Sequence, residues 1–464
     1  MGKYKNLLNN SIIFAIGNLG TKTIVMLLVP LYTYTLTTAE YGTADLITSI
    51  INLSLPVASL SIFEATLRFV MDKSMDQLKI LNSALAVTGA GSLLIVFVLI
   101  FVNFLFKEQR ILVNYLSIIL ILQMFQTLFA QYLRGIGKVK IFAANGILNA
   151  VILAVSNLLF LFILKMKIDG YFLSIIFANF ISNIFLLAHI DVKKIFSYRK
   201  IDTPFIKYML NYSIPLIPNS LMWWIVNTSS RYFILFFSGV EANGLFAVSA
   251  KIPSIITIFQ SIFFQAWQLS AIDEFNNKER NKFYQQVFNV FSCFMFLITA
   301  IVILFIKPII YFAVSSAYYL SWKYVPFLLI GVLFSSFSSF MGTLYVASKE
   351  TNEIMKSSFI GALANILTCL ILVPKFGANG AAIASAFSFI FIFLYRVNDI
   401  YKKISFKIDL KQIALSTFIL ILEILILYYV DFLTIIPVLI LIILNYKRIS
   451  FLVGFIKNRG KSID

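Results

Sequence analysis

Apolar segments of about 20 residues follow one another along most of this chain, separated by short polar breaks. A helix of that length spans the hydrocarbon core of a bilayer. The pattern predicts about fourteen transmembrane helices, near residues 11–36, 43–70, 80–106, 112–133, 141–164, 170–190, 208–237, 243–270, 283–306, 324–347, 355–374, 379–397, 411–430 and 432–446. The predicted fold class is an all-α integral membrane protein.

The spans occur in two similar sets. When the sequence is shifted by 202 positions, Ser11 and Gly42 fall on Ser213 and Gly244. Each set holds six spans, an even number, so both sets run in the same direction through the membrane. They are therefore expected to form two parallel repeats related by an axis along the membrane normal, which is a common design among secondary transporters.

The later spans of the two sets also correspond, because Lys165 and Gly170 lie 210 positions before Lys375 and Gly380. The predicted organisation is an N-lobe at 1–190, a basic cytoplasmic linker at 191–207, a C-lobe at 208–400, a final helix pair at 401–446 and a basic cytoplasmic tail at 447–464. The tail mixes apolar residues with cations. It is expected either to lie against anionic headgroups or to be a ragged terminus.

Composition excludes a soluble globular protein, because 60% of the 464 residues are hydrophobic and only 12% are charged. The net charge of +18 does not indicate nucleic acid, since the cations are scattered over many loops. If the N-terminus is inside, cytoplasmic loops hold 28 Lys and Arg residues and the opposite loops hold 7. The positive-inside rule then places both termini in the cytoplasm, and the first span is expected to be retained rather than removed as a signal.

Motifs for catalysis or cofactor binding are missing. The cysteines Cys293 and Cys369 lie in apolar runs, so they predict neither a disulfide framework nor a metal site. The one histidine, His189, stands at a span end. No P-loop, zinc-protease or nucleophile-elbow motif occurs. We therefore expect no cofactor, no metal and no enzymatic activity.

Cations inside spans are the main candidates for function, because burying a charge in a membrane is costly. Lys22 lies in the first span, and Asn18 stands four residues before it on the same helical face. In the equivalent seventh span, Asn227 and Arg231 repeat this spacing. Arg231 lies two turns further outward, roughly 10 Å at helical rise. The two cations would suit an anionic cargo such as a phosphate, although Arg231 could also snorkel to the headgroups.

Further candidates are weaker. Lys251 in the eighth span could be a third cation of the site or an interfacial anchor. Glu64 and Arg68 stand four residues apart in the second span, where they could form an intrahelical ion pair or bind a coupling ion at the inner mouth. Glu423 lies in the middle of the thirteenth span and is a second candidate for ion coupling.

Amides within the spans allow two interpretations, because they could line a cleft that accepts sugar hydroxyls or form hydrogen bonds between helices. They are Asn52, Gln126, Asn149, Asn157, Gln260 and Asn365.

The chain resembles the polysaccharide flippases of the multidrug/oligosaccharidyl-lipid/polysaccharide (MOP) exporters, the Wzx-type O-antigen and capsule translocases. The resemblance rests on the stretch from Pro30 to Gly42, on Glu64 to Phe69, and on Lys375 to Ala384, which is similar to the family's turn into the twelfth span. It extends over the whole length, although no single motif in it is very specific.

This resemblance implies two six-helix lobes in a V-shaped, MATE-like arrangement around a cationic cleft. It implies a flippase that moves undecaprenyl-pyrophosphate-linked oligosaccharide units from the inner to the outer leaflet of a bacterial cell membrane by alternating access, for synthesis of capsule, O-antigen or exopolysaccharide. Lys22, Arg231 and Lys251 would attract the pyrophosphate, and Arg68 would lie near the inner entrance. Membrane lipid would be a partner, and polysaccharide polymerases and glycosyltransferases are further candidate partners.

Two other functions compete with this one. An ion-coupled multidrug antiporter of the same superfamily would share the fold, but it would be expected to favour carboxylates within the spans. A membrane-embedded polysaccharide polymerase or ligase would need a sizeable loop for its acceptor and catalytic residues, whereas the breaks on the outer side are short.

Overall fold

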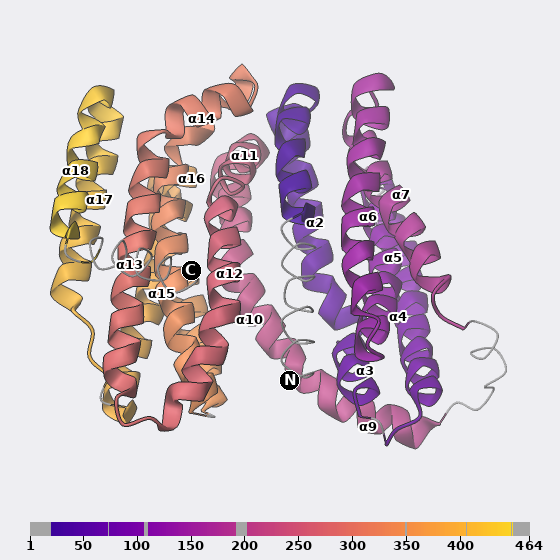
Figure 1. Ribbon diagram of the computed structural model, residues 1–464. Coiled ribbons are helices and arrows are strands. Elements are labelled where there is room, and N and C mark those ends of the chain that lie inside the picture. Colours follow the sequence, from indigo (N-terminus) through magenta and orange to yellow (C-terminus); the bar gives the residue numbers. More distant parts are fainter. Residues whose placement is uncertain are drawn as a thin grey trace, which may run out of the picture. The chain divides into compact units, whose positions relative to one another are not determined.

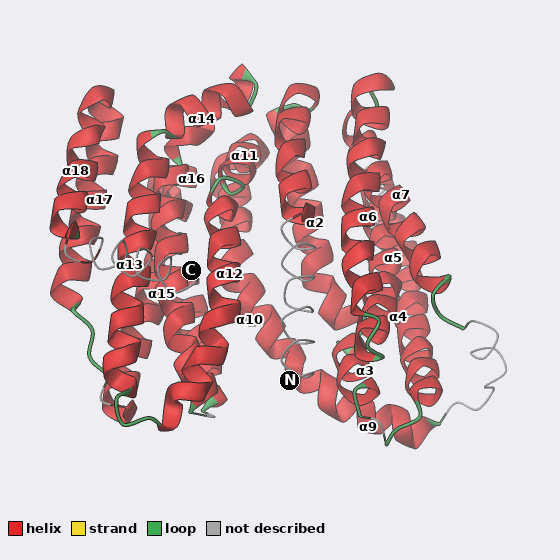
Figure 2. Cartoon of the chain, viewed as in Figure 1, coloured by secondary structure: helices red, strands yellow, loops and turns green. Residues whose placement is uncertain are grey.

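The computed structural model describes residues 20–72, 74–105, 110–191, 202–348, 350–404, 406–446 and 448. Within these ranges the secondary structure is helical, and short turns connect the helices (Figures 1 and 2). The predicted all-α class is confirmed. The chain divides into two compact units, unit 1 at Met1–Thr228 and unit 2 at Ser229–Asp464.

Nine helices in the described ranges are long and apolar enough to cross a membrane, or ten if the bent pair α2 and α3 counts as one span. Two of the nine cover 47 and 53 residues. A straight helix of about 53 residues would measure roughly 80 Å, far more than a bilayer. Each contains a glycine with a positive φ angle, 85° at Gly239 and 56° at Gly377, where the helical path is interrupted. The count of about fourteen stays a prediction.

Unit 1 begins, in the described part, with a helix at residues 20–35. The elements that follow are α2 (Thr38–Ala58), α3 (Ile62–Val70), α4 (Gln77–Leu105), α5 (Arg110–Gly135), α6 (Val139–Asn157), the π-helix η2 (Leu158–Ile163), α7 (Lys167–Leu187), α9 (Thr203–Ser213), the 3₁₀ helix η3 (Ile214–Leu216) and α10 (Ile217–Thr228). The predicted division into an N-lobe, a linker, a C-lobe and a final helix pair stays a prediction.

The predicted second span is not one continuous helix. Leu60 and Ser61 have φ angles of 48° and 49°, and the axes of α2 and α3 differ by 57°. Pro56 lacks a backbone donor and lies inside α2, close to this break. The Leu55 and Pro56 carbonyl oxygens at the bend each accept a backbone N–H, from Ser59 and Ser61, and the hydroxyls of the same two serines donate to them as well.

Unit 2 is built around α15 and α16. Its elements are α11 (Ser230–Ser249), α12 (Pro253–Asp273), η4 (Glu274–Asn276), α13 (Arg280–Leu304), α14 (Ile306–Ala313), η5 (Ser316–Lys323), α15 (Val325–Ala347), α16 (Thr351–Ile404), α17 (Leu410–Tyr429), η6 (Asp431–Thr434) and α18 (Ile435–Leu444). The 3₁₀ helix η6 leads into α18, so the predicted span at 432–446 is a regular α-helix only at its centre. The predicted eighth span is broken between α11 and α12, where Pro253 opens the second helix.

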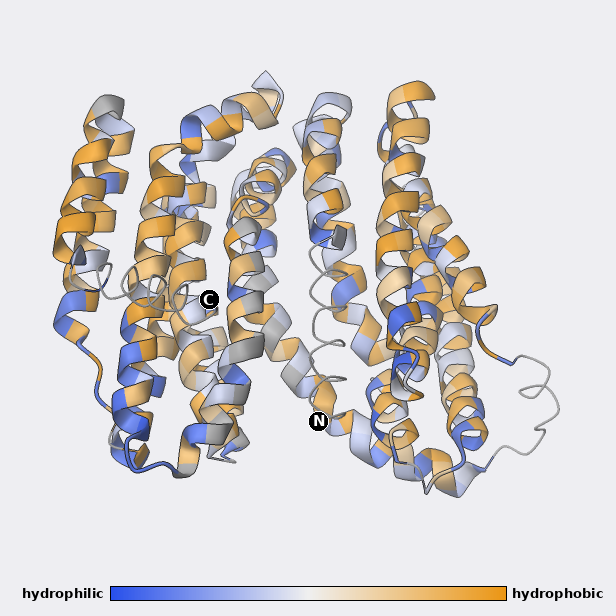
Figure 3. Cartoon of the chain, in the orientation of Figure 1, coloured by the Kyte–Doolittle hydropathy of each residue, from blue (hydrophilic) through white to orange (hydrophobic). Residues whose placement is uncertain are grey.

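Aromatic side chains fill the centre of unit 2. Trp267 on α12 stacks on Phe340 of α15 at a centroid distance of 4.2 Å, and Phe263 stacks on Phe291 of α13 at the same distance. Outer faces are also apolar: Leu93 of α4 is 73% exposed. Hydrophobic residues cover much of α6 and α18 on the faces that Figure 3 shows. Such faces suit lipid rather than water.

The two predicted repeats, which we call copies, share a turn in which a glycine packs closely against the end of the preceding span. A Cβ on Gly170, at the start of α7, would lie 3.0 Å from the Phe160 carbonyl oxygen, and a Cβ on Gly380 would lie 2.3 Å from that of Leu372. Both glycines therefore let the sixth span of a copy begin directly against the end of its fifth span. The correspondence between residues 165–170 and 375–380 in sequence is matched by this common backbone packing.

A buried arginine joins the helices of unit 2. Arg396, near the end of α16, is 3% exposed. Its Nη1 donates to the Ser338 carbonyl oxygen of α15 at 2.7 Å, and its Nε donates to the Ser357 hydroxyl in the first half of α16 at 2.9 Å. Gly342 leaves the space, because a Cβ there would lie 2.8 Å from Nη1. From its place at the end of the predicted span 379–397, Arg396 is expected among the cytoplasmic loop cations, whereas the structure buries its side chain between helices.

We predict that Arg396→Leu lowers the free energy of unfolding by about 2–4 kcal/mol, because hydrogen bonds to a buried charged group are lost. Thermal unfolding in detergent would measure the change. The matched control is Lys402→Leu, an exposed lysine on the same helix, which should change stability by less than about 0.5 kcal/mol. Equal effects of the two substitutions would show that Arg396 does not hold these helices together.

Candidate functional site

Lys22 lies near the start of the first described helix. Gly20 and Thr21 face α6, since a Cβ on Gly20 would lie 3.8 Å from Ile147 and one on Gly146 would lie 3.5 Å from the Thr21 hydroxyl oxygen. The Lys22 side chain is exposed and forms no hydrogen bond or ion pair with the residues that the structure describes. Asn18, its predicted polar neighbour, lies outside the described residues.

Arg231 is the second residue of α11 and is half-buried. A polar cluster fixes the backbone just before it: the hydroxyls of Ser229 and Ser230 donate to Oδ1 of Asn365 on α16, at 3.0 and 3.5 Å. Asn227 lies one turn earlier, in α10, and its side chain is outside the described part. The structure therefore places Arg231 in the first turn of α11, directly after two serines that are hydrogen-bonded to α16.

Lys251 stands in the turn between α11 and α12 and is half-buried. The hydroxyl of Ser254 donates to the Lys251 carbonyl oxygen, which holds the turn. Its place at a break between helices differs from the predicted position inside a continuous span. A break of this kind leaves the cation at the end of a helix rather than along its side.

Glu64 and Arg68 both lie on α3, with Arg68 exposed and Glu64 half-buried. They form no ion pair in the described structure, so the intrahelical pair, one of the two interpretations of these residues, is not observed. Arg68 is close enough to Asp72 to act on its charge. The pKa of Asp72 is lowered, first by the hydrogen bond that Ser74 donates to its carboxylate and also by the Arg68 charge.

Glu423 is fully buried in α17. Neither carboxyl oxygen has a hydrogen-bond partner among the described residues. An ionised carboxylate in such surroundings would be very costly. Its position is consistent with a candidate for ion coupling, and α17 packs against α13 and α18 in unit 2.

Three of the amides serve as hydrogen-bonding groups between helices. Asn149 of α6 donates to Oδ1 of Asn179 and to the hydroxyl of Ser182 on α7, at 3.2 and 3.0 Å. Asn157 donates to the Tyr32 phenol oxygen at 3.2 Å. Together with Asn365 in unit 2, these contacts favour the interhelical interpretation of such residues over the sugar-binding one.

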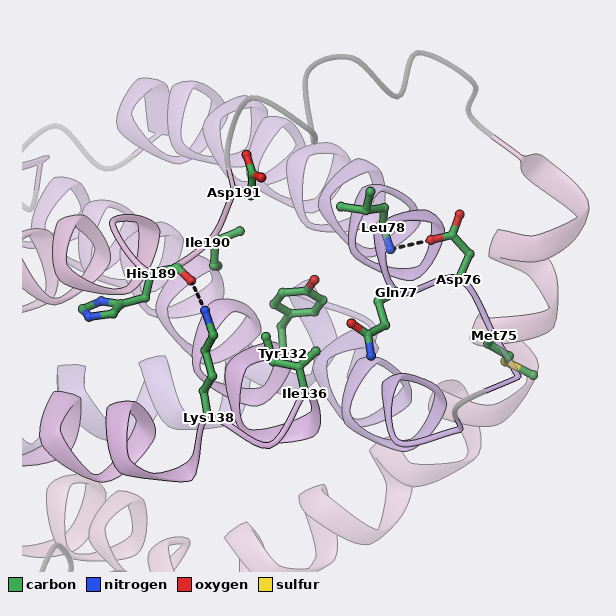
Figure 4. A pocket seen from close by; sticks show the side chains of 10 residues that line it. All are labelled: Met75, Asp76, Gln77, Leu78, Tyr132, Ile136, Lys138, His189, Ile190 and Asp191. Carbon is green, nitrogen blue, oxygen red and sulfur yellow. Dashed lines mark hydrogen bonds between the residues drawn. The ribbon is translucent and has the colours of Figure 1, made fainter.

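A polar cavity of about 490 Å³ opens at one end of unit 1, where α4 begins and α5 and α7 end (Figure 4). Lys138 Nζ donates to the His189 carbonyl oxygen at 2.8 Å across its edge. Asp76 caps α4 through the Leu78 N–H, at 2.9 Å. Tyr132 lines the cavity and is 6% exposed. Nothing in the sequence pattern pointed to this grouping, because its residues come from separate breaks.

The same end of unit 1 is tied to α9. Lys79 and Asp202 form an ion pair at 2.6 Å, and the Lys79 ammonium also lies over the Phe205 ring. The hydrogen bond from Lys79, followed by the one from the Phe205 N–H, holds the pKa of Asp202 below its usual range. The contact with α9 is therefore strongest when Asp202 is ionised.

The fold is similar to the folds of several solved membrane transporters. The structure is similar to the lipid II flippase MurJ in an inward closed conformation, with a TM-score of 0.69, 15% identity and coverage of 97% of this chain and 99% of that one. It is also similar to an inward-facing MATE multidrug transporter of the MOP superfamily, with a TM-score of 0.63, 14% identity and coverage of 86% and 94%. A third similar structure is that of a MOP-superfamily transporter from Pyrococcus furiosus. Its TM-score is 0.59 and its sequence identity is 14%, with coverage of 85% of this chain and 95% of that one.

Residues 7–268 match the family described as polysaccharide biosynthesis protein. This match covers more than half of the sequence, so the chain belongs to that family and is a multi-pass membrane protein. The predicted resemblance is confirmed at the level of this family and of the fold that the chain shares with MurJ and MATE transporters. No curated protein matches the chain in sequence.

We predict that Glu423→Leu raises the free energy of unfolding by about 1–2 kcal/mol, because it replaces an unpartnered buried carboxyl by an apolar side chain. If Glu423 binds a coupling ion, the same variant should transport more slowly although it is more stable. Thermal unfolding and an uptake assay would measure the two effects, with Glu423→Gln as the polar control. If Glu423→Leu were less stable than the native protein, this result would contradict the conclusion that the Glu423 carboxyl has no hydrogen-bond partner.

Proposed function

We propose that this protein is a flippase that moves undecaprenyl-pyrophosphate-linked oligosaccharide units from the inner to the outer leaflet of a bacterial cell membrane. Membership of the polysaccharide biosynthesis family and the fold shared with a lipid II flippase support this proposal. The protein acts as a transporter and performs no catalysis. Its termini are cytoplasmic, by the distribution of loop cations.

The headgroup of such a substrate is the part that resists transfer across the membrane. An ionised pyrophosphate carrying several sugars cannot cross hydrocarbon unaided, because transfer of its charge from water is very costly. Cations that accept phosphate oxygens along a protected path remove much of that cost. The two units would alternately expose this path to each side of the membrane, as in other transporters built from repeats.

The observation that carries the proposal is Lys22. It is exposed, it is the one charged residue of the helix at residues 20–35, and it has no partner among the described residues. A structural lysine at such a position would be expected to pair with a carboxylate or a carbonyl. Arg231 would supply a second contact from the equivalent helix of the other unit, with Lys251 and Arg68 as additional cations.

A multidrug antiporter is the second candidate, because MATE transporters share the fold. The carboxylates Glu64 and Glu423 are the side chains that would serve it. Under the flippase proposal they are candidates for ion coupling instead. Polysaccharide polymerases and glycosyltransferases are the proposed partners, since they consume and supply a lipid-linked oligosaccharide.

We predict that Lys22→Ala and Arg231→Ala each slow translocation of a labelled undecaprenyl-pyrophosphate oligosaccharide in proteoliposomes by about tenfold or more, because one charge-assisted contact to the substrate is lost. The control is Lys207→Ala, which removes an exposed lysine of α9 that forms no hydrogen bond or ion pair with the described residues. It should leave the rate unchanged.

Two results would contradict parts of this proposal. Translocation by the native protein that neither substitution affects would keep the function and reject the site. No translocation above that of empty vesicles, together with ion-driven uptake of organic cations, would favour the antiporter.

A further inference from the structure

A second cavity lies at the turn between α6 and α7, at the end of unit 1 that the loop charges assign to the outer side. Its volume is about 530 Å³, and it is lined by Tyr34, Thr35, Leu161, Phe162, Lys165 and Lys167. We call it the turn pocket. From sequence alone, Lys165 and Lys167 are two of the seven loop cations expected on that side.

The backbone of this turn is strained at both lysines. Lys165 and Lys167 each have a φ angle of 53°, in the left-handed region that glycine and asparagine adopt more easily. The turn is also held from within, because the Met166 N–H donates to the Phe160 carbonyl oxygen at 2.9 Å. Lysine is thus present at two positions where the backbone favours another residue, and strain of this kind is a pointer to function.

The two ammonium groups are available. Both lysines are exposed, and neither forms a hydrogen bond or ion pair with any residue in the described part of the chain. They stand two residues apart on one short turn that lines a single cavity. Two cations that line one cavity repel each other, so an anion bound in the cavity would be stabilising.

The rest of the pocket is suited to an amphipathic ligand. Tyr34 is 67% exposed and offers a phenol donor, whereas the Thr35 hydroxyl already donates to the Leu31 carbonyl oxygen at 2.7 Å. Phe162, which is 65% exposed, and the buried Leu161 form the apolar part. Cations, a tyrosine and an exposed aromatic ring together are typical of the headgroup level of a membrane.

We propose that the turn pocket binds the phosphate of an anionic glycerophospholipid, with Lys165, Lys167 and Tyr34 donating to the phosphate oxygens and Phe162 contacting the acyl chains. The cavity opens at the surface of unit 1 and lies at a helix end, where phospholipid headgroups surround the protein. This site is distinct from the cations Lys22 and Arg231 and does not depend on the proposed transport function. It would fix the outer end of unit 1 to the lipid leaflet.

The sharpest test uses Lys165→Gly/Lys167→Gly, because glycine removes both cations and also relieves the backbone strain. Binding of phosphatidylglycerol to the full-length protein in detergent would be measured by native mass spectrometry. The site predicts at least a fivefold loss of affinity in this variant, together with equal or higher thermal stability without lipid. Lys165→Arg/Lys167→Arg should keep the affinity, because both charges remain.

The control variant is Lys207→Ala/Lys375→Ala, which removes two exposed lysines elsewhere and should bind phosphatidylglycerol like the native protein. Equal loss of affinity in the control and the glycine variant would overturn the proposal, because the lysines would then attract lipid only through net charge. Phosphatidylcholine that binds the native protein as tightly would also overturn it. Undecaprenyl phosphate that binds in a lysine-dependent manner, while phosphatidylglycerol does not, would assign the pocket to a polyprenyl lipid instead.

Discussion

A polar group inside hydrocarbon must find its partner within the protein, and the rest of this structure depends on that constraint. Arg396 meets it with a carbonyl and a hydroxyl from neighbouring segments, in space that Gly342 leaves open. The Asn157 amide nitrogen donates to Tyr32, whereas its Oδ1 has no partner among the described residues. Polar side chains of the spans that have no partner in the described part of the chain are candidates for function. Lys22 and Glu423 are the two that we propose to act in transport.

Backbone irregularities mark the places where the helices change direction. Gly239 and Gly377 interrupt two double-length helices, and the break near Ser61 bends α2 away from α3 by 57°. Gly170 and Gly380 let consecutive spans of each copy begin in close contact. Such positions define rigid segments and the joints between them. Alternating access requires both, since rigid segments must move while their internal hydrogen bonds persist.

The positions of most spans could be predicted from sequence, because apolar length is a local signal: α13 and α15 begin within three residues of their predicted starts. The break near Ser61 was missed because hydropathy does not register backbone dihedral angles. Arg396 was misplaced because a cation near a span end is counted as a loop residue until its packing is known. Lys22 could be singled out by its depth in an apolar span, whereas the partners of Glu64 depend on side-chain geometry that spacing alone does not determine.

The proposed function requires that this protein recognises a phosphate-bearing glycolipid rather than an organic cation. Competition binding to the purified native protein tests it directly, with a labelled undecaprenyl-pyrophosphate oligosaccharide displaced either by inorganic pyrophosphate or by tetraphenylphosphonium. The account predicts that pyrophosphate displaces the glycolipid, that rising salt weakens its binding, and that tetraphenylphosphonium has no effect. Saturable binding of tetraphenylphosphonium without binding of the glycolipid would contradict the account.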